Sequence, residues 1–180
     1  MRTLLYVLTI LFWCCAGQTA DNYYNSGVAK DERGDLKGAI ADYSKAIEIN
    51  PHYFIAYNNR GNSYQHIGRH DLAIADYNKT IELEPENGMP YNNRGFTFLL
   101  LGELEKAEGD LRKSLELNEN NIYALNSMAE LYSARNNPDE ACRWLKMAVQ
   151  KGYNNWNYLK TSKTYDNIRY SESPEVSVKS

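Results

Sequence analysis

The segment YNNRGNSY at residues 57–64 recurs as YNNRGFTF at residues 91–98, an interval of 34 residues from 57 to 91. A second segment, AIADYSKAIEINP at 39–51, recurs at the same interval as AIADYNKTIELEP at 73–85. Two separate segments that share one period indicate a tandem repeat. Each unit of such a repeat forms one supersecondary element that buries its apolar face against its neighbours.

The period extends in both directions and aligns five columns over four units. Small residues are expected where two helices cross closely, because a larger side chain would hold the backbones apart, whereas aromatic residues and Leu fill the space between crossings. The columns are Tyr23, Tyr57, Tyr91 and Leu125; Gly27, Gly61, Gly95 and Ala129; Ala39, Ala73, Ala107 and Ala141; Tyr43, Tyr77, Leu111 and Leu145; and Ala46, Thr80, Ser114 and Ala148.

Each unit is predicted to hold two helices. In the second unit the first helix is expected from about Tyr53 to Ile67 and the second from about Asp71 to Leu83. Pro51 and Pro85 follow the second helices and prevent their continuation. Between the two helices of every unit stands a residue that accepts the left-handed backbone conformation, namely Gly34, Gly68, Gly102 and Asn136.

The period, the aromatic–Gly–aromatic first helix, the A-x-x-x-[YL]-x-x-[AST] second helix and the closing Pro resemble the tetratricopeptide repeat (TPR) family. The resemblance spans residues 20–155, and departs from the family pattern at Lys30 and Ala129. It implies an all-α, right-handed solenoid with a concave groove lined by the first helix of each unit. The predicted units are residues 20–53, 54–87, 88–121 and 122–155.

Residues 156–170 leave the period and are predicted to form a C-terminal cap. A solenoid exposes the apolar face of its last helix unless something covers it. Trp156, Leu159, Tyr165 and Ile168 could supply that cover. The alternative is that these residues form a patch to which a partner docks. Residues 171–180, SESPEVSVKS, are small and polar and are predicted to be a flexible tail.

Residues 1–17 have the layout of a secretory signal peptide. Arg2 precedes an apolar run from Leu4 to Trp13, and small residues follow. The run is shorter than the roughly 20 residues that a membrane-spanning helix needs. The chain is therefore expected to be exported to the periplasm or the extracellular space, with no integral membrane span in its mature form. Cys14 and Cys15 leave lipid anchoring open as an alternative.

The sequence offers no sign of catalysis, and we expect a non-enzymatic protein without cofactor or metal. Phosphate-cradling glycine loops and nucleophile motifs are absent from the sequence. His66 and His70 could suggest a metal pair, but Gly68 separates them. The formal net charge of the 180 residues is -3, so the basic excess that nucleic-acid binding requires is missing.

A ladder of amide side chains on the first helices is the candidate binding feature. An Asn amide both donates and accepts hydrogen bonds, so a row of amides can hold an extended peptide backbone. Ile55, Met89, Phe96 and Tyr123 would add apolar patches to the groove. The alternative is that the amides are only solvated. The predicted peptide-binding residues are Asn25, Asn58, Asn59, Asn62, Asn92, Asn93, Phe96 and Asn126.

Two charged columns are predicted to be structural. Arg60 and Arg94 stand in first helices, and Asp42, Asp76 and Asp110 stand in second helices at the repeat spacing. A guanidinium pairs well with a carboxylate, so we expect ion pairs between helices, the alternative being a ligand-facing basic stripe. Some TPR proteins hold a terminal carboxylate with a basic clamp. That resemblance fails here, because the matching positions hold Tyr24, Asn58, Met89 and Tyr123.

The most direct hypothesis for function is a scaffold that binds a protein or an extended peptide segment in the groove of the repeat array. Two alternatives stay open, namely a lipid-anchored envelope assembly factor and the regulatory subunit of an enzyme complex. The partner is expected to be a protein, whose identity the sequence does not give.

Overall fold

The computed structural model describes residues 19–166, and this part of the chain contains helices and no strand. The predicted signal peptide, Cys14, Cys15, residues 167–170 of the predicted cap and the predicted tail at 171–180 lie outside it. The helices are α2 (Ala20–Asp31), α3 (Leu36–Ile49), α4 (Phe54–His66), α5 (His70–Leu83), α6 (Gly88–Leu100), α7 (Leu104–Leu117), α8 (Ile122–Ala134), α9 (Pro138–Gln150) and α10 (Trp156–Thr161), followed by a 3-10 turn at Lys163–Tyr165.

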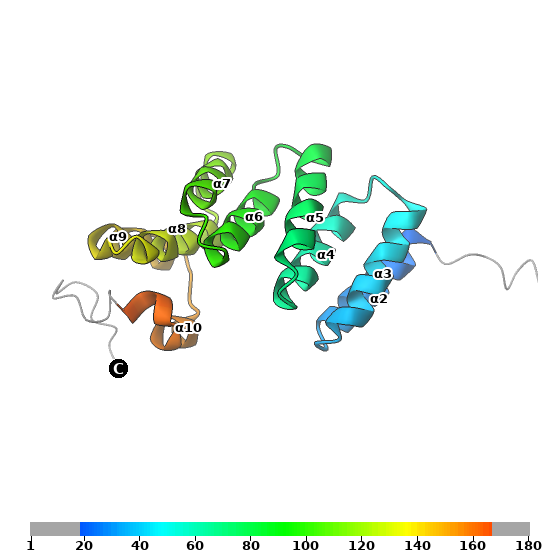
Figure 1. Ribbon diagram of the computed structural model, residues 1–180, viewed down its shortest axis with the longest axis horizontal. Coiled ribbons are helices and arrows are strands. Elements are labelled where there is room, and N and C mark those ends of the chain that lie inside the picture. Colours follow the sequence, from blue (N-terminus) through cyan, green and yellow to red (C-terminus); the bar gives the residue numbers. More distant parts are fainter. Residues whose placement is uncertain (1–18, 167–180) are drawn as a thin grey trace, which may run out of the picture.

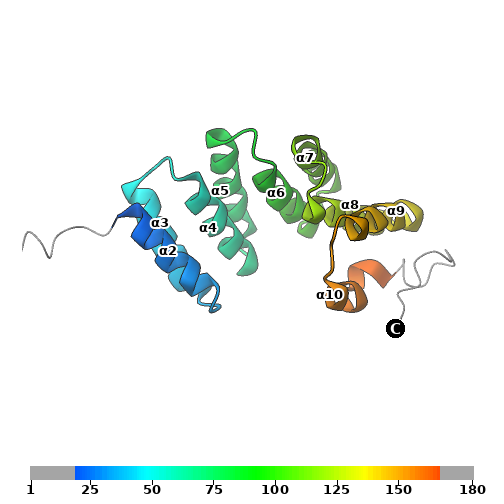
Figure 2. The ribbon, with the colours of Figure 1, turned by 180° about the vertical axis from the view of Figure 1, so that it is seen from behind.

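The helices form pairs that lie side by side in chain order. We call α2, α4, α6 and α8 the A helices, and α3, α5, α7 and α9 the B helices. Each A helix packs against the B helix that follows it, and each B helix packs against the next A helix. The pairs run from α2 and α3 at one end to α8 and α9 at the other, and their axes turn progressively along the stack (Figures 1 and 2). The all-α solenoid expected from the sequence is thereby confirmed.

A residue in the left-handed backbone conformation lies in the turn after every A helix, as the sequence predicts. Gly34, Gly68 and Gly102 have φ angles of +78°, +75° and +74°, and Asn136 has φ +55°. The fourth A–B turn then places Asn137 at the N-cap of α9, where its side chain accepts a hydrogen bond from the Glu140 N–H. These turns reverse the chain within a few residues, so A and B helices lie antiparallel.

The repeat columns form the core. The four alanines of one column are fully buried, as are the small residues that follow seven positions later. In the second unit Gly61 packs against Tyr77, and a Cβ atom added to Gly61 would lie 2.7 Å from the Tyr77 ring. Each A–B crossing is therefore filled by one large B-helix side chain that rests on a residue with little or no side chain.

Consecutive A helices also contact each other directly, α2 with α4, α4 with α6, and α6 with α8. Side-chain hydrogen bonds cross these junctions, for example from Asn93 on α6 to Asn58 on α4. The repeat units are thus in contact through their A helices, and the exposed side of α2, α4, α6 and α8 forms one continuous surface along the array. We call this surface the A face.

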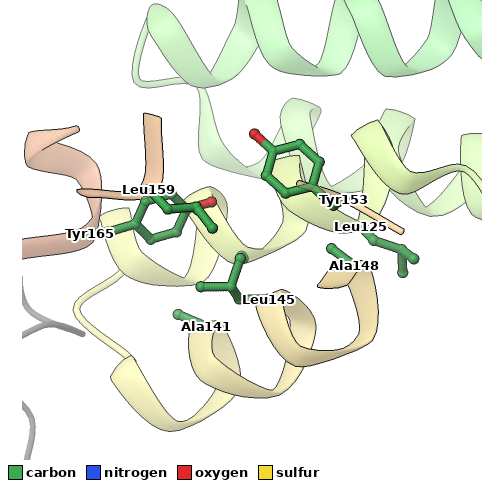
Figure 3. Packing of buried hydrophobic residues seen from close by; sticks show 8 residues of the cluster. Leu125, Ala141, Leu145, Ala148, Tyr153, Leu159 and Tyr165 are labelled. Carbon is green, nitrogen blue, oxygen red and sulfur yellow. The ribbon is translucent and has the colours of Figure 1, made fainter. Parts of the chain in front are cut away.

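The segment after α9 packs on the last repeat. Leu159 of α10 and Tyr165 of the 3-10 turn join a buried cluster with Leu125 of α8 and Leu145 of α9 (Figure 3). Of the predicted covering residues, Leu159 and Tyr165 thus pack on the last repeat. The 3-10 turn contacts α8, the A helix of that repeat.

Within residues 19–166 no helix combines the length and the apolar character needed to cross a membrane.

Candidate protein-binding groove

A column of exposed apolar side chains runs along the A face. It consists of Ile55, Met89 and Tyr123, each the second residue of its A helix, and these side chains are 39%, 58% and 64% exposed. The equivalent residue of α2 is Asp21. We call Ile55, Met89 and Tyr123 the apolar column. Because these residues occupy one position of three successive units whose A helices are in direct contact, they form an exposed apolar strip, and exposed apolar patches mark protein-interaction sites.

The amide side chains predicted for the groove lie beside this column. Residues three, four and seven positions apart share one helix face, so Asn58, Asn59 and Asn62 follow Ile55 along α4. Asn58 and Asn92 are buried, Asn59, Asn62, Asn93 and Phe96 are half-buried, and Asn25 is exposed. The structure therefore brings most of the predicted residues together on one face, at different depths.

The amides hydrogen-bond to one another across the A–A junctions. Asn93 Nδ2 donates to Asn58 Oδ1 and to Asn62 Oδ1, both at 3.1 Å. In the preceding junction Asn59 Nδ2 donates to the Tyr24 hydroxyl at 3.2 Å. In the following junction the Ser127 hydroxyl donates to Asn92 Oδ1 at 3.3 Å. These amides thus link successive repeats, a role that the sequence reasoning did not include. Their binding of a peptide stays a prediction.

The A–B ion pairs expected from the sequence are confirmed. Arg60 Nε and Nη2 donate to the two carboxylate oxygens of Asp76 at 2.8 and 2.7 Å, and Nη1 donates to Ser44 of the preceding B helix at 3.0 Å. Arg94 makes the same fork to Asp110, with both distances 2.7 Å. In the first unit Lys30 pairs with Asp42 at 2.6 Å. These cations hold helices together and do not form an open basic stripe.

Burial affects the ionisation of Asp76 in the ion pair with Arg60. It raises the pKa of Asp76 above its ordinary value, although the hydrogen bonds from Arg60 and the attraction of its charge work in the opposite direction. A fork of two hydrogen bonds to a half-buried guanidinium is the arrangement that keeps such a carboxylate ionised. Asp76 is therefore dependent on Arg60 as its counter-charge.

The C-terminal end of the A face holds a buried carboxyl group. Glu130 of α8 is only 3% exposed. Its Oε1 accepts a hydrogen bond from Asn126 Nδ2 at 2.7 Å, and its Oε2 accepts one from the Tyr158 hydroxyl at 3.0 Å. Burial raises its pKa from 4.5 to about 7, because desolvation disfavours the charged form more than the two hydrogen bonds favour it.

The tyrosines of the C-terminal segment take the place of a further repeat. At the junction between α4 and α6, the amide of Asn93 on the incoming A helix contacts Asn58 and Asn62. Asn126 and Glu130 are the corresponding residues of α8. The Tyr165 hydroxyl donates to Asn126 Oδ1 at 2.9 Å, and Tyr158 reaches Glu130. Asn126 was among the residues predicted for the groove, whereas Glu130 and Tyr158 were not, although Glu130 falls in the same column as Asn62 and Phe96.

No group of three or more His, Cys, Asp or Glu side chains arranged to bind a metal occurs within residues 19–166. His66 is the last residue of α4 and His70 the first of α5, with the left-handed Gly68 between them. Along α4, α6 and α8 the A face offers apolar side chains, neutral amides and hydroxyls, and α2 adds the carboxylates of Asp21 and Asp31. Such a surface suits recognition of a polypeptide.

Comparison with known families finds the tetratricopeptide repeat four times along the chain. Residues 32–68 match a TPR repeat, and residues 54–87, 76–109 and 122–152 each match a tetratricopeptide repeat. Similar curated proteins include an uncharacterized protein of Methanocaldococcus jannaschii, 37% identical over 52 residues, or 29% of this chain. Another is human tetratricopeptide repeat protein 6, 44% identical over 48 residues, or 27% of this chain. The matches span 60% and 9% of those two proteins.

Solved structures share the fold. The first TPR of Spaghetti (RPAP3), bound to the HSP90 peptide SRMEEVD, is 27% identical with a TM-score of 0.63, over 66% of this chain and 94% of that one. A chain of the APC/C hetero-tetramer Cut9-Hcn1 is 19% identical with a TM-score of 0.77, over 93% of this chain and 32% of the matched chain. With the repeat period, the helix pairs and the four family matches, these likenesses lead to one conclusion: the chain belongs to the tetratricopeptide repeat family.

Proposed function

We propose that this protein is a scaffold that holds an extended segment of another protein along its A face and does not itself catalyse a reaction. One observation carries the proposal, namely the apolar column of Ile55, Met89 and Tyr123. These three residues stand at one position of three successive repeats and are between 39% and 64% exposed. A partner segment that covered them would remove apolar area from water, which favours association.

Family and fold support this proposal. Tetratricopeptide repeats are generally non-catalytic interaction modules, and the similar TPR of Spaghetti is bound to a peptide. The repeating geometry of such arrays creates extended binding surfaces. Half-buried Asn59, Asn62 and Phe96 adjoin the apolar column and would meet the backbone and side chains of a bound segment.

A photocrosslinking experiment tests the proposal. A photoreactive phenylalanine analogue placed at Met89 should crosslink a protein partner in the cell of origin. The same analogue at Met147, an exposed methionine on the B helix α9, should not. Equal crosslinking from both sites, or none from Met89, would contradict a binding site on the A face.

We further propose that the chain acts outside the cytoplasm after removal of residues 1–17. The short apolar run from Leu4 to Trp13 supports this. N-terminal sequencing of the native protein should give a start near Gln18 or Asp21, whereas an intact Met1 would overturn the proposal. A start at Cys14 or Cys15 that incorporates labelled fatty acid would instead establish the lipid-anchored alternative.

A further inference from the structure

We infer that the A face selects a segment with an apolar side chain at every third residue and a basic residue at one end, and that it rejects acidic tails. This inference rests on the proposed function and adds the chemistry of the partner. It follows from two independent features of the A helices, the distribution of their charges and the spacing of the apolar column.

The cations of the A helices are already neutralised by B helices. Within the described chain the only Lys or Arg residues on A helices are Lys30, Arg60 and Arg94. Each is paired with an aspartate of the adjoining B helix, and the Arg60 and Arg94 side chains are only 18% and 20% exposed. An acidic segment laid along these helices would therefore meet no cation that is free to receive it.

Acidic groups on the A helices lack such counter-charges. Asp21 and Asp31 are not among the ion pairs of residues 19–166, and their carboxylates accept hydrogen bonds from neutral hydroxyls. The Tyr53 hydroxyl donates to Asp21 Oδ1 at 2.6 Å, and the Ser63 hydroxyl donates to Asp31 Oδ1 at 3.1 Å. Both lie on α2, and Glu130, the other acidic residue of the A helices, is only 3% exposed, so solvent-facing negative charge gathers at the N-terminal end of the A face. A basic residue of the partner fits that end.

The spacing of the column sets the period of the segment. Helices in direct contact lie about 8–10 Å apart, and successive A helices are in direct contact. A polyproline-II segment rises about 3.1 Å per residue with three residues per turn, so every third side chain points the same way about 9 Å further along. Apolar side chains at i, i+3 and i+6 would therefore meet Ile55, Met89 and Tyr123 in turn. Asp21 occupies the next position of the series, where the basic residue would lie.

Three synthetic peptides of equal length test this inference against the full chain by fluorescence anisotropy. The first carries an Arg followed by Leu at every third position, with Ser and Pro between them. The second has the same composition with its three Leu side by side, and the third replaces the Arg by Asp. We expect the first to bind, the second to bind roughly tenfold more weakly because two Leu lose their contacts, and the third several-fold more weakly.

Paired variants locate the contacts. Met89→Ser should weaken binding of the first peptide, and Met147→Ser on α9 should not. Asp21→Asn keeps an acceptor for Tyr53 but removes the charge at the end of the apolar column, so it should reduce the preference for Arg over Asp. Asp71→Asn, an exposed aspartate at the start of α5, should leave that preference unchanged.

The outcomes separate the inference from the proposed function. Equal affinity for the three peptides, tighter binding of the Asp peptide, or no binding of any peptide would overturn the inference. The proposed function would survive each of these results if photocrosslinking from Met89 still captured a partner, and would fail if it did not.

Discussion

Gly61 and Tyr77 face each other where α4 crosses α5, and the absence of a side chain at Gly61 makes room for the ring. A Cβ atom at Gly61 would lie 2.7 Å from Tyr77 Cε1. Gly61→Ala should therefore destabilise the protein by roughly 1–3 kcal/mol through overpacking, as measured by urea unfolding. Gly109→Ala, on α7 with open space around the added methyl, should stabilise it by up to about 1 kcal/mol because Ala has the higher helix propensity.

A double variant distinguishes overpacking from a general intolerance of Ala at this crossing. In the third and fourth units the B helix carries Leu in place of Tyr77. A Cβ atom at Gly95 of the third unit would lie 3.1 Å from Leu111 Cγ, and the fourth unit already has Ala129 beside Leu145. Gly61→Ala combined with Tyr77→Leu should thus cost less than the two single changes added together. Strict additivity of the two free energies would refute the contact as the cause.

Glu130 gives the stability a pH dependence of known sign. Its pKa is about 7 in the folded protein against an ordinary 4.5, so the folded state binds the proton of Glu130 more tightly than the unfolded state does. The free energy of unfolding that the protonated side chain contributes is fully present below pH 4.5 and is lost as the pH rises through 7, a change of about 3 kcal/mol. Glu130→Gln should therefore be more stable than the parent at pH 8 and similar to it at pH 4.5 by thermal unfolding.

The matching control is Glu119→Gln, which removes an exposed carboxylate from the loop after α7. It should shift the melting temperature little at either pH. If the parent and Glu130→Gln keep a constant difference between pH 4.5 and pH 8, the burial of Glu130 does not control its ionisation.

At the scale of the element, the segment after α9 is predicted to be a structural part of the array. Deleting residues 154–180 removes Leu159 and Tyr165 and uncovers Leu125 and Leu145. The shortened protein should melt at a lower temperature and aggregate, because the last repeat then exposes an apolar face. Deleting only residues 171–180 should change neither property. A protein that ends at residue 153 and stays monomeric and equally stable would show that the segment has another role.

The helices could be predicted from the sequence almost residue by residue because one period fixes many positions together. Phe54–His66 and His70–Leu83 agree with the helices expected at about 53–67 and 71–83. The left-handed turn residues and the ion pairs of Arg60 and Arg94 could also be predicted by comparing residues 34 positions apart. Residues at the same position of successive repeats have similar surroundings, so what holds for one unit holds for the next.

The burial of each Asn side chain in the amide ladder could not be predicted from the repeat period. Asn58 and Asn59 are adjacent in sequence, so their side chains leave the helix in directions about 100° apart, and a repeat period says nothing of which direction faces the neighbouring unit. The structure shows Asn58 buried at the A–A junction. The hydrogen bonds of Glu130 and Asn126 were missed because the tyrosines that donate to them, Tyr158 and Tyr165, lie in a segment without any repeat period.

Across the whole molecule, the A–A hydrogen bonds should make unfolding cooperative. Stability in a solenoid is the sum of the stabilities of the units and of their interfaces. Asn93→Ala removes the two bonds from Asn93 Nδ2 to Asn58 and Asn62, at about 1–3 kcal/mol in total, and so weakens the junction between α4 and α6. The repeats on either side should then unfold at different urea concentrations.

Two probes can follow the two sides separately when the protein is expressed without residues 1–17. Its remaining tryptophans, Trp144 and Trp156, lie in the C-terminal part, whereas circular dichroism reports every helix. The two curves should coincide for Asn25→Ala, which removes an exposed amide of the same column, and separate for Asn93→Ala. Coincident curves for both variants would show that these bonds do not couple the repeats.

The way Tyr158 and Tyr165 occupy the end of the array bears on how such a chain can lengthen during evolution. A duplicated unit inserted between residues 87 and 88 would offer the Asn58–Asn93 type of junction on both of its sides, and the contacts of Asn126 and Glu130 would be undisturbed. A unit appended after residue 155 would find its docking position already taken by the two tyrosines. Growth is thus favoured from the interior, and each inserted unit would lengthen the partner segment that the A face can cover by about three residues.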